Sequence, residues 1–235
     1  MRTIAILQAR MSSSRFPGKV IAELDDLPMV AFMAARVAQC AAIDKVILAT
    51  SELDSDKPLV DAAQAYGIEV FRGSLENVLE RFVKVQALAK ADLIIRMTGD
   101  CPLADPEVIG DLIALRAREG ADYASNVEPR TYPYGFECEI FTAEALARAW
   151  ANARDAYDRE HVTPWMQSDA ANLKRANLQR APDLSHMRLT VDYPEDLEVV
   201  RRVVASTHRN ARLAEIAAWL SSHPDVARIN SHHSQ

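Results

Sequence analysis

The sequence predicts an α/β fold in which helices cover both faces of a mostly parallel sheet. The first observation is that short apolar runs alternate with longer helical patterns through the first half of the chain. The second is that these runs are apolar at nearly every position, as in strands that are buried on both faces. The third is the repeated order strand, helix, strand, which builds right-handed crossover units and therefore parallel strands.

The elements of the first half can be assigned in order. We expect four strands, at residues 4–7, 45–50, 68–71 and 92–97. Between them we expect three helices, at about 28–41, 57–66 and 75–90. The first two helices carry a proline near their starts, where a missing backbone N–H does little harm.

The pattern changes after about residue 120. The stretch 123–140 is rich in aromatic residues, prolines and carboxylates, and it predicts loops with short strands. Beyond it we expect helices at about 142–154 and 158–169, a strand at 188–191, a helix from Pro194 and an amphipathic helix at about 212–222. We therefore expect a single domain, 1–235, with a substrate-facing segment at about 120–165 and a frayed tail at about 223–235.

Composition excludes several classes of protein. The net charge of −6 argues against nucleic-acid binding, which usually requires a basic stripe. Three cysteines without a C-x-x-C pair argue against a disulfide framework or a structural zinc site, and they fit a reducing compartment. Since no apolar stretch approaches eighteen residues, we expect no membrane span and a cytoplasmic protein.

A cationic loop follows the first strand. Residues 9–19 hold the cations Arg10, Arg15 and Lys19, the hydroxyls of 12–14 and a Pro-Gly turn. Open α/β sheets bind ligands at the carboxyl ends of their strands, and these groups suit a phosphate chain. The loop has one glycine and is not a Walker P-loop. The alternative is a solvated, basic surface turn.

Two aspartates occupy matching positions at strand ends. Asp100 follows the fourth strand, and Asp192 follows the strand at 188–191. Carboxylates beside a triphosphate repel it unless a hard cation lies between them, so we expect both to bind Mg²⁺, with Mn²⁺ as a substitute. The combination predicts phosphoryl or nucleotidyl transfer. The alternatives are a helix N-cap at Asp192 and a turn aspartate at Asp100.

Six strings of the sequence resemble one enzyme family. They are QARMSSSRFPGK (8–19), FRGS with VLERF (71–74 and 78–82), TGDCPL (98–103), DREHVTP (158–164) and TVDYPEDLE (190–198). They are similar to the signature of the CMP-sugar synthetases, and most of all to cytidylyltransferases of the spore-coat polysaccharide (SpsF) type, relatives of the CMP-Kdo and CMP-sialic acid synthetases. The strings span nearly the whole chain.

The resemblance implies a fold, a reaction and a set of residues. The fold is the GT-A-like nucleotide-diphospho-sugar transferase fold, and the reaction transfers CMP from CTP to a sugar acid, releasing pyrophosphate, for surface polysaccharide biosynthesis. Arg10, Arg15 and Lys19 would be catalytic and hold the triphosphate, and Asp100 and Asp192 would bind the metal. The implied nucleotide-binding residues are Ala9, Arg10, Ser13, Arg15, Lys19, Arg72, Gly73, Ser74, Asn77 and Thr98.

The acceptor site is expected in the segment that breaks the strand–helix rhythm, because loop variation usually sets specificity. Arg130 or Arg159 would clamp the carboxylate of a sugar acid. Glu137 and Glu139 would accept hydrogen bonds from sugar hydroxyls or an amino group. His161 is either a substrate ligand or a buried, hydrogen-bonded histidine.

Two other functions fit the same residues. One is a GT-A-type glycosyltransferase that uses a nucleotide sugar, and the other is a non-catalytic nucleotide-binding module. The resemblance also makes a homodimer plausible. The pair Asp54 and Asp56 matches the D-x-D pattern of glycosyltransferase metal sites, but it precedes Lys57-Pro58, and a helix cap is the favoured interpretation.

Overall fold

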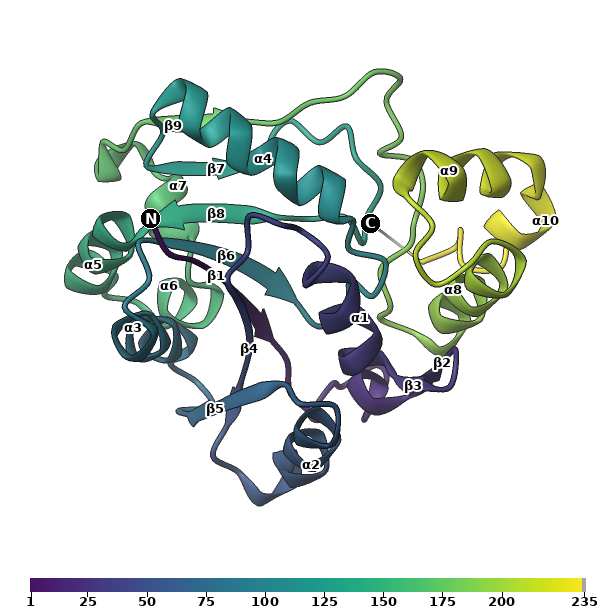
Figure 1. The fold of residues 1–235 in the computed structure, drawn as a ribbon, viewed down its shortest axis with the longest axis horizontal. Helices are drawn as coiled ribbons and strands as arrows, with labels where there is room; N and C mark the ends of the chain where they lie inside the picture. Colours follow the sequence, from purple (N-terminus) through teal and green to yellow (C-terminus); the bar gives the residue numbers. More distant parts are fainter. Residues whose placement is uncertain (234–235) are drawn as a thin grey trace.

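A seven-stranded sheet forms the centre of the computed structural model, which describes residues 1–233 (Figure 1). The strand order is β5-β4-β1-β6-β8-β7-β9. The strands are β1 Thr3–Gln8, β4 Lys45–Ser51, β5 Glu69–Gly73, β6 Leu93–Thr98, β7 Tyr123–Ser125, β8 Glu139–Thr142 and β9 Arg175–Asn177. A separate pair is formed by β2 Glu23–Leu24 and β3 Leu27–Pro28.

The sheet is mostly parallel, as predicted. Strands β5, β4, β1 and β6 pair in parallel, so their carboxyl ends lie at one edge. Strand β8 is antiparallel to both β6 and β7, and β9 returns to a parallel pairing with β7. The change of direction coincides with the change of sequence pattern after residue 120.

Helices cover both faces of the sheet (Figure 1). One face carries α1 Met29–Val37, α2 Lys57–Ala65 and α4 Pro106–Glu119. The other carries α3 Val78–Ala89, α5 Ala143–Asn152, α6 Ala156–His161 and α7 Pro164–Gln167. Short 3-10 turns lie at η1 Lys19–Ile21, η2 Asp54–Asp56 and η3 Asp169–Ala171. Helix α4 lies outside the helices that we predicted.

Strand β1 shows why the apolar runs predicted a doubly covered sheet. Ala5 and Leu7 pack into the cluster beneath α1, α2 and α4. Ile4 and Ile6 point the other way, into the cluster beneath α3 and α5. Successive side chains of a strand point to opposite faces of the sheet. A strand that helices cover on both faces must therefore be apolar at successive positions.

The C-terminal helices form a third cluster at one end of the sheet. They are α8 Pro194–Ser206, α9 Leu213–Ser222 and α10 Pro224–Ala227. Arg36 of α1, which is buried, donates hydrogen bonds to the carbonyl oxygens of Ala104 and Ala211 and so joins this cluster to the body. Asn230 is buried as well and donates to Asp196. The expectation of a frayed tail is therefore wrong for residues 223–230, whereas Ser234 and Gln235 lie outside the described residues.

Two predicted elements differ in detail. The helix expected at 158–169 is divided into α6 and α7, because Val162 between them has a positive φ of 72° and Pro164 begins the next turn. The strand expected at 188–191 makes a single bridge, from Arg188 to Tyr134. Beyond that bridge the chain turns toward β6, where the Val191 N–H donates to the carbonyl oxygen of Asp100.

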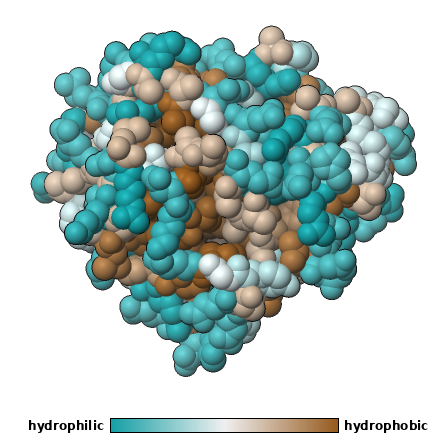
Figure 2. Space-filling model, in the orientation of Figure 1, coloured by the Kyte–Doolittle hydropathy of each residue, from teal (hydrophilic) through white to brown (hydrophobic). Residues whose placement is uncertain are grey.

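The surface is hydrophilic over most of the face in Figure 2, and hydrophobic residues gather in a hollow near its centre. Residues of α1 and of strands β4 and β5 line a groove on this side, among them Ala31, Ala35 and Val46. Within residues 1–233, no helix combines the length and the apolar character that crossing a membrane requires.

Candidate functional site

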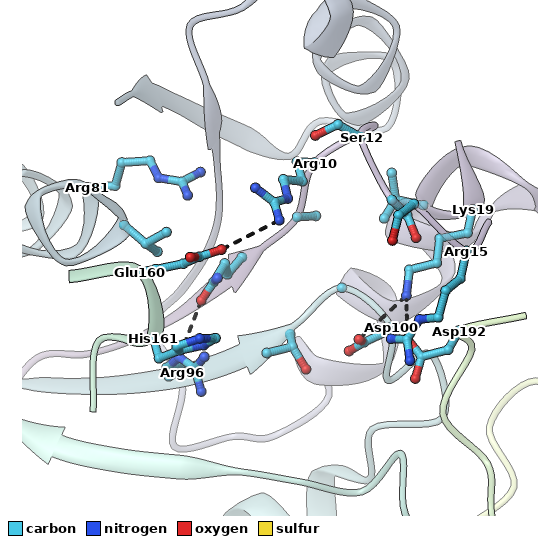
Figure 3. A pocket seen from close by; sticks show the side chains of 18 residues that line it. Arg10, Ser12, Arg15, Lys19, Arg81, Arg96, Asp100, Glu160, His161 and Asp192 are labelled. Atoms are coloured by element: carbon cyan, nitrogen blue, oxygen red, sulfur yellow. Dashed lines mark hydrogen bonds and ion pairs between the residues drawn. The ribbon is translucent and has the colours of Figure 1, made fainter. Parts of the chain in front are cut away.

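An open pocket of about 440 Å³ lies at the carboxyl ends of β1 and β6 (Figure 3). It has two chemically different ends. The carboxylate end consists of Arg15, Lys19, Asp100 and Asp192. The guanidinium end consists of Arg10, Arg81, Arg96, Glu160 and His161. The lining is completed by Gln8, Ala9, serines 12–14, Val20, Val78, Thr98 and Gly99.

The two strand ends meet closely at the floor of the pocket. The Gly99 N–H donates to the carbonyl oxygen of Gln8 at 2.8 Å. A Cβ atom on Gly99 would lie 2.7 Å from the Cβ of Ala9, closer than real side chains approach. Gly99 therefore lets the loop after β1 and the loop after β6 share one floor.

Asp56 holds the cationic loop in place. Its carboxylate accepts hydrogen bonds from the Met11 N–H at 2.7 Å and from the Thr50 hydroxyl at 3.0 Å, and Ser51 donates to it as well. Burial opposes ionisation, but these bonds outweigh it and lower the pKa of Asp56. The expected helix cap is thus wrong for the side chain of Asp56, which makes no capping bond to α2.

Lys19 is the centre of the carboxylate end. Its Nζ atom lies 3.0 Å from a carboxylate oxygen of Asp192 and 3.5 Å from one of Asp100, and it donates to the carbonyl oxygen of Val191 at 2.6 Å. Arg15 reaches Asp192 at 2.7 Å. Burial opposes ionisation of Asp100, but the charge of Lys19 and a hydrogen bond from Thr98 outweigh it and lower the pKa of Asp100.

Asp192 is not the residue that caps α8. Asp196 accepts hydrogen bonds from the backbone N–H groups of Asp192 and Tyr193, and it pairs with the buried Arg188 at 2.8 Å. The side chain of Asp192 is left to face the pocket, with Arg15, Lys19 and Arg188 around it. The helix cap that was the alternative role for Asp192 is therefore formed by Asp196.

The donor set of the carboxylate end fits a divalent cation. Asp100 and Asp192 both place an oxygen within 3.5 Å of one ammonium nitrogen, so they converge on a single positive charge. Within residues 1–233, no three His, Cys, Asp or Glu side chains gather as a metal site of their own. Two carboxylates completed by phosphate oxygens and water are the usual protein environment of Mg²⁺.

The guanidinium end holds its cations differently. The side chains of Arg10 and Glu160 are about half exposed, and 3.6 Å separates the Arg10 Nη2 atom from the Glu160 Oε1 atom. Arg96 pairs with the buried Glu139, its register partner on β8, and donates to Gln8 at 3.3 Å. A charged residue in the middle of an apolar strand was the signal in the sequence that could have identified Arg96 as a site residue.

Four predicted nucleotide-binding residues lie outside the pocket lining, at the end of β5 and in the turn that leads to α3. Arg72 donates to the carbonyl oxygens of Ser51 and Leu53. Asn77 caps α3 by accepting from the Glu80 N–H, and the Ser74 hydroxyl accepts from the Asn77 N–H. Gly73, the fourth, packs against the stem of Arg81. The turn supports α3, which carries Arg81 into the pocket.

The predicted acceptor residues divide into three groups. Arg130 and Glu137 pair with each other at 2.6 Å, beside the pocket rather than in its lining. Glu139 forms an ion pair with Arg96 and does not line the pocket, whereas His161 lines it directly. Arg159 is exposed on α6 and does not line the pocket.

Cys101 connects Glu137 to the carboxylate end. Its sulfur lies 3.3 Å from a carboxylate oxygen of Glu137 and 3.5 Å from one of Asp100. Burial and these two negative charges raise the pKa of Cys101 well above its usual value. The thiol therefore stays protonated, which argues against a role for Cys101 as a nucleophile.

Comparison with known proteins gives a consistent result. A family model described as "Cytidylyltransferase" matches residues 4–218. The spore coat polysaccharide biosynthesis protein SpsF of Bacillus subtilis is 35% identical over 234 residues, covering 94% of this chain and 95% of that protein. The 3-deoxy-manno-octulosonate cytidylyltransferase of Rhizobium leguminosarum is 32% identical, covering 86% of this chain and 95% of that protein.

A solved structure extends the similarity to the fold. A cytidylyltransferase from Leptospira borgpetersenii matches with a TM-score of 0.93 at 26% identity, covering 100% of this chain and 99% of that one. The expected nucleotide-diphospho-sugar transferase fold is confirmed by this likeness together with the mostly parallel sheet.

Proposed function

Because this chain belongs to the cytidylyltransferase family, we propose that it transfers CMP from CTP to a sugar acid, with release of pyrophosphate. The observation that carries the proposal is the carboxylate end of the pocket. There the first loop brings Arg15 and Lys19 to two carboxylates that originate 92 residues apart, Asp100 and Asp192. Phosphate-binding cations beside carboxylates that can hold a divalent cation are the recurring parts of enzymes that transfer phosphoryl groups.

The side chains of the loop would act mainly by position and charge. Arg15 offers a planar fork for two phosphate oxygens, and Lys19 offers a point charge beside the carboxylates. Both would stabilise the negative charge that develops on the leaving pyrophosphate. Serines 12–14 and backbone N–H groups of the loop would donate further hydrogen bonds to the triphosphate.

Asp100 and Asp192 would hold the divalent cation, which supplies charge neutralisation between the triphosphate and the carboxylates. The low pKa of Asp100 keeps that side chain ionised and ready for a cation at neutral pH. When a metal is bound, Lys19 would exchange its carboxylate partners for phosphate oxygens. Because carboxylate and phosphate oxygens are both negatively charged, the Lys19 ammonium would keep negatively charged partners throughout this exchange.

The acceptor would lie on the β8 side of the reacting phosphate. Arg96 lines the pocket there and is oriented by Glu139 and Gln8, contacts that use its Nε and one Nη atom. We assign the acceptor carboxylate to Arg96 in place of Arg159, which does not line the pocket. The pair Arg130 and Glu137 would bind the more distant hydroxyl groups of the sugar.

The names of two relatives suggest the biological setting. One is named for 3-deoxy-manno-octulosonate, a sugar acid, and the other for spore coat polysaccharide biosynthesis. We propose by analogy that this chain activates a sugar acid for a surface polysaccharide.

The test is a matrix of nucleotides and acceptors. The protein is incubated with Mg²⁺, each of the four ribonucleoside triphosphates and a panel of keto-sugar acids, and pyrophosphate is measured. We expect pyrophosphate only with CTP and an acidic acceptor, and none after EDTA is added. Release of free CMP or UDP from a nucleotide sugar would instead favour a glycosyltransferase. CTP binding without any turnover across a broad panel would favour a binding module.

A further inference from the structure

Arg81 is a buried cation with unused hydrogen-bonding capacity. Its side chain lines the pocket, yet the residue is only 2% exposed. One Nη atom donates to the carbonyl oxygen of Ala49 at 3.3 Å, a long bond. Its Nε atom is buried and has no hydrogen-bond partner among the described residues. A buried donor without an acceptor is costly, so this edge of the guanidinium is suited to a ligand.

The position of Arg81 identifies which part of a nucleotide it would meet. Ala49, its backbone partner, lies near the carboxyl end of β4, on the opposite side of β1 from β6. Asp100 follows β6, so the reacting phosphate would lie on the β6 side and the acceptor beyond it toward β8. Figure 3 accordingly shows Arg81 at the far side of the pocket from Asp100 and Asp192. The part of CTP farthest from the leaving group on this side is the nucleoside.

The surrounding turn is built to hold Arg81 in this place. A Cβ atom on Gly73 would lie 2.8 Å from the Cγ of Arg81, so only glycine leaves room for the arginine stem. Asn77 caps the first turn of the helix that carries Arg81. These two predicted nucleotide-binding residues therefore act through Arg81.

We propose that Arg81 binds the pyrimidine base of CTP by donating a hydrogen bond from its free edge to the O2 carbonyl of cytosine. The inference rests on the proposed cytidylyl transfer. An arginine offers donors only, and O2 is an acceptor, whereas the exocyclic amine of cytosine is a donor. The phosphates already have Arg15 and Lys19, which lie at the other end of the pocket.

Arg81 stays charged in this environment. Burial, together with repulsion from Arg10, lowers the pKa of Arg81 to about 10. This value is still well above neutral pH. A charged donor in a buried site gives a stronger hydrogen bond than a neutral one. Such a site also discriminates strongly against an analogue that lacks the matching acceptor.

The experiment compares CTP with 2-thio-CTP, in which sulfur, a poor acceptor, replaces O2. Dissociation constants are measured by calorimetry for the wild-type protein and for Arg81→Met. The wild-type protein should bind 2-thio-CTP about 10-fold more weakly than CTP or worse. Arg81→Met should bind CTP more weakly and should bind both nucleotides with equal affinity.

Two controls separate recognition from folding. Tripolyphosphate should bind Arg81→Met as it binds the wild-type protein, because the phosphate end is intact. Arg148→Met removes another guanidinium that donates to a backbone carbonyl, that of Ala171, away from the pocket. It should leave the ratio between CTP and 2-thio-CTP unchanged. Gly73→Ala, which displaces Arg81 without removing it, should reduce the ratio toward one.

The outcomes are distinct for the two proposals. If Arg81→Met keeps the wild-type preference for CTP over 2-thio-CTP, the preference arises from the size of sulfur and the inference is wrong. Equal loss of tripolyphosphate and CTP binding would also overturn it, since Arg81 would then act through the fold. If the wild-type protein binds no CTP at all, it is the proposed function that fails.

Discussion

The two ends of the pocket differ in how fully their charged side chains are paired. At the carboxylate end, Lys19 and Arg15 lie 2.7–3.5 Å from carboxylate oxygens of Asp100 and Asp192, so positive and negative charges are already matched. At the guanidinium end, Arg10 has one loose partner at 3.6 Å, and Arg81 forms no ion pair with any of the described residues. One end is a balanced cluster, and the other retains unused donors.

This difference indicates how each end would respond to a ligand. Ions that enter the carboxylate end must replace existing ion pairs, so binding there is an exchange between charged partners and depends on ionic strength. A ligand at the guanidinium end can satisfy donors that have no partner, without breaking a contact. The first arrangement suits a phosphate chain with its cation, and the second suits recognition of a particular group.

The largest effect is expected from Lys19, because its side chain is only 10% exposed and contacts both carboxylates. Charge-assisted hydrogen bonds contribute about 1.5–3 kcal/mol, or about 10- to 150-fold in affinity or rate. Lys19→Met should reach the upper end of this range in pyrophosphate formation. Arg15→Ala, at a side chain that is 50% exposed, should stay near the lower end.

The matched control is Lys57→Ala, which removes a surface ion pair with Asp61. It should leave turnover unchanged, since exposed pairs contribute little. Near-normal turnover and CTP affinity in both Lys19→Met and Arg15→Ala would show that the first loop is a surface turn.

The next effect separates metal binding from helix capping. Asp192→Asn and Asp100→Asn should each weaken the dependence of activity on Mg²⁺ and reduce turnover, while the thermal midpoint changes little. Asp196→Asn should do the reverse and lower the thermal midpoint, because it removes the buried negative charge that pairs with Arg188. A loss of stability in Asp192→Asn with unchanged metal dependence would restore the capping interpretation.

A smaller and more selective effect is expected at Arg96. Arg96→Met should raise KM for the sugar acid and leave the dissociation constant of CTP unchanged, because Arg96 would contact the acceptor alone. Glu139→Gln should give a weaker version of the same change by releasing Arg96. If the acceptor kinetics of Arg96→Met match those of Arg159→Met and of the wild-type protein, the acceptor carboxylate binds elsewhere.

The smallest effect is a change in acid stability. The pKa of Asp56 is lowered in the folded protein, so its contribution is present above the unfolded value of about 3.9 and is lost as pH falls through the folded value. Urea unfolding of Asp56→Asn between about pH 3 and pH 7 should show a shallower acid decline than the wild-type protein. Parallel declines would mean that Asp56 does not titrate with unfolding.

The sequence predicted the parallel half of the fold better than the rest. Strands β1, β4, β5 and β6 were found within a few residues of their expected positions, because a strand that is covered on both faces is apolar throughout. The helix expected at 158–169 and the strand expected at 188–191 were only partly correct. Their ends depend on tertiary contacts, such as the positive φ of Val162, that have no local signature.

The same contrast holds for the candidate site. Arg10, Arg15, Lys19 and Asp100 lie together because strand ends in a parallel sheet meet at one edge. Asp192 joins them because the Val191 N–H donates to the carbonyl oxygen of Asp100. Arg81 was missed as a site residue, since an arginine on a helix face usually reaches solvent and nothing local shows that it is buried. Asn77 and Gly73 were predicted to bind the nucleotide; in the structure Asn77 caps α3 and Gly73 packs against the stem of Arg81.

We propose that this pocket transfers CMP from CTP to an acidic sugar. The most direct measurement is ³¹P NMR of CTP, Mg²⁺ and a keto-sugar acid with the protein, followed over time. We predict that the three triphosphate resonances decline as pyrophosphate and one phosphodiester resonance rise in equal amounts, and that Lys19→Met slows both. Free CMP in place of the phosphodiester, or CTP that stays intact with every acidic acceptor, would contradict the proposed transfer of CMP to a sugar acid.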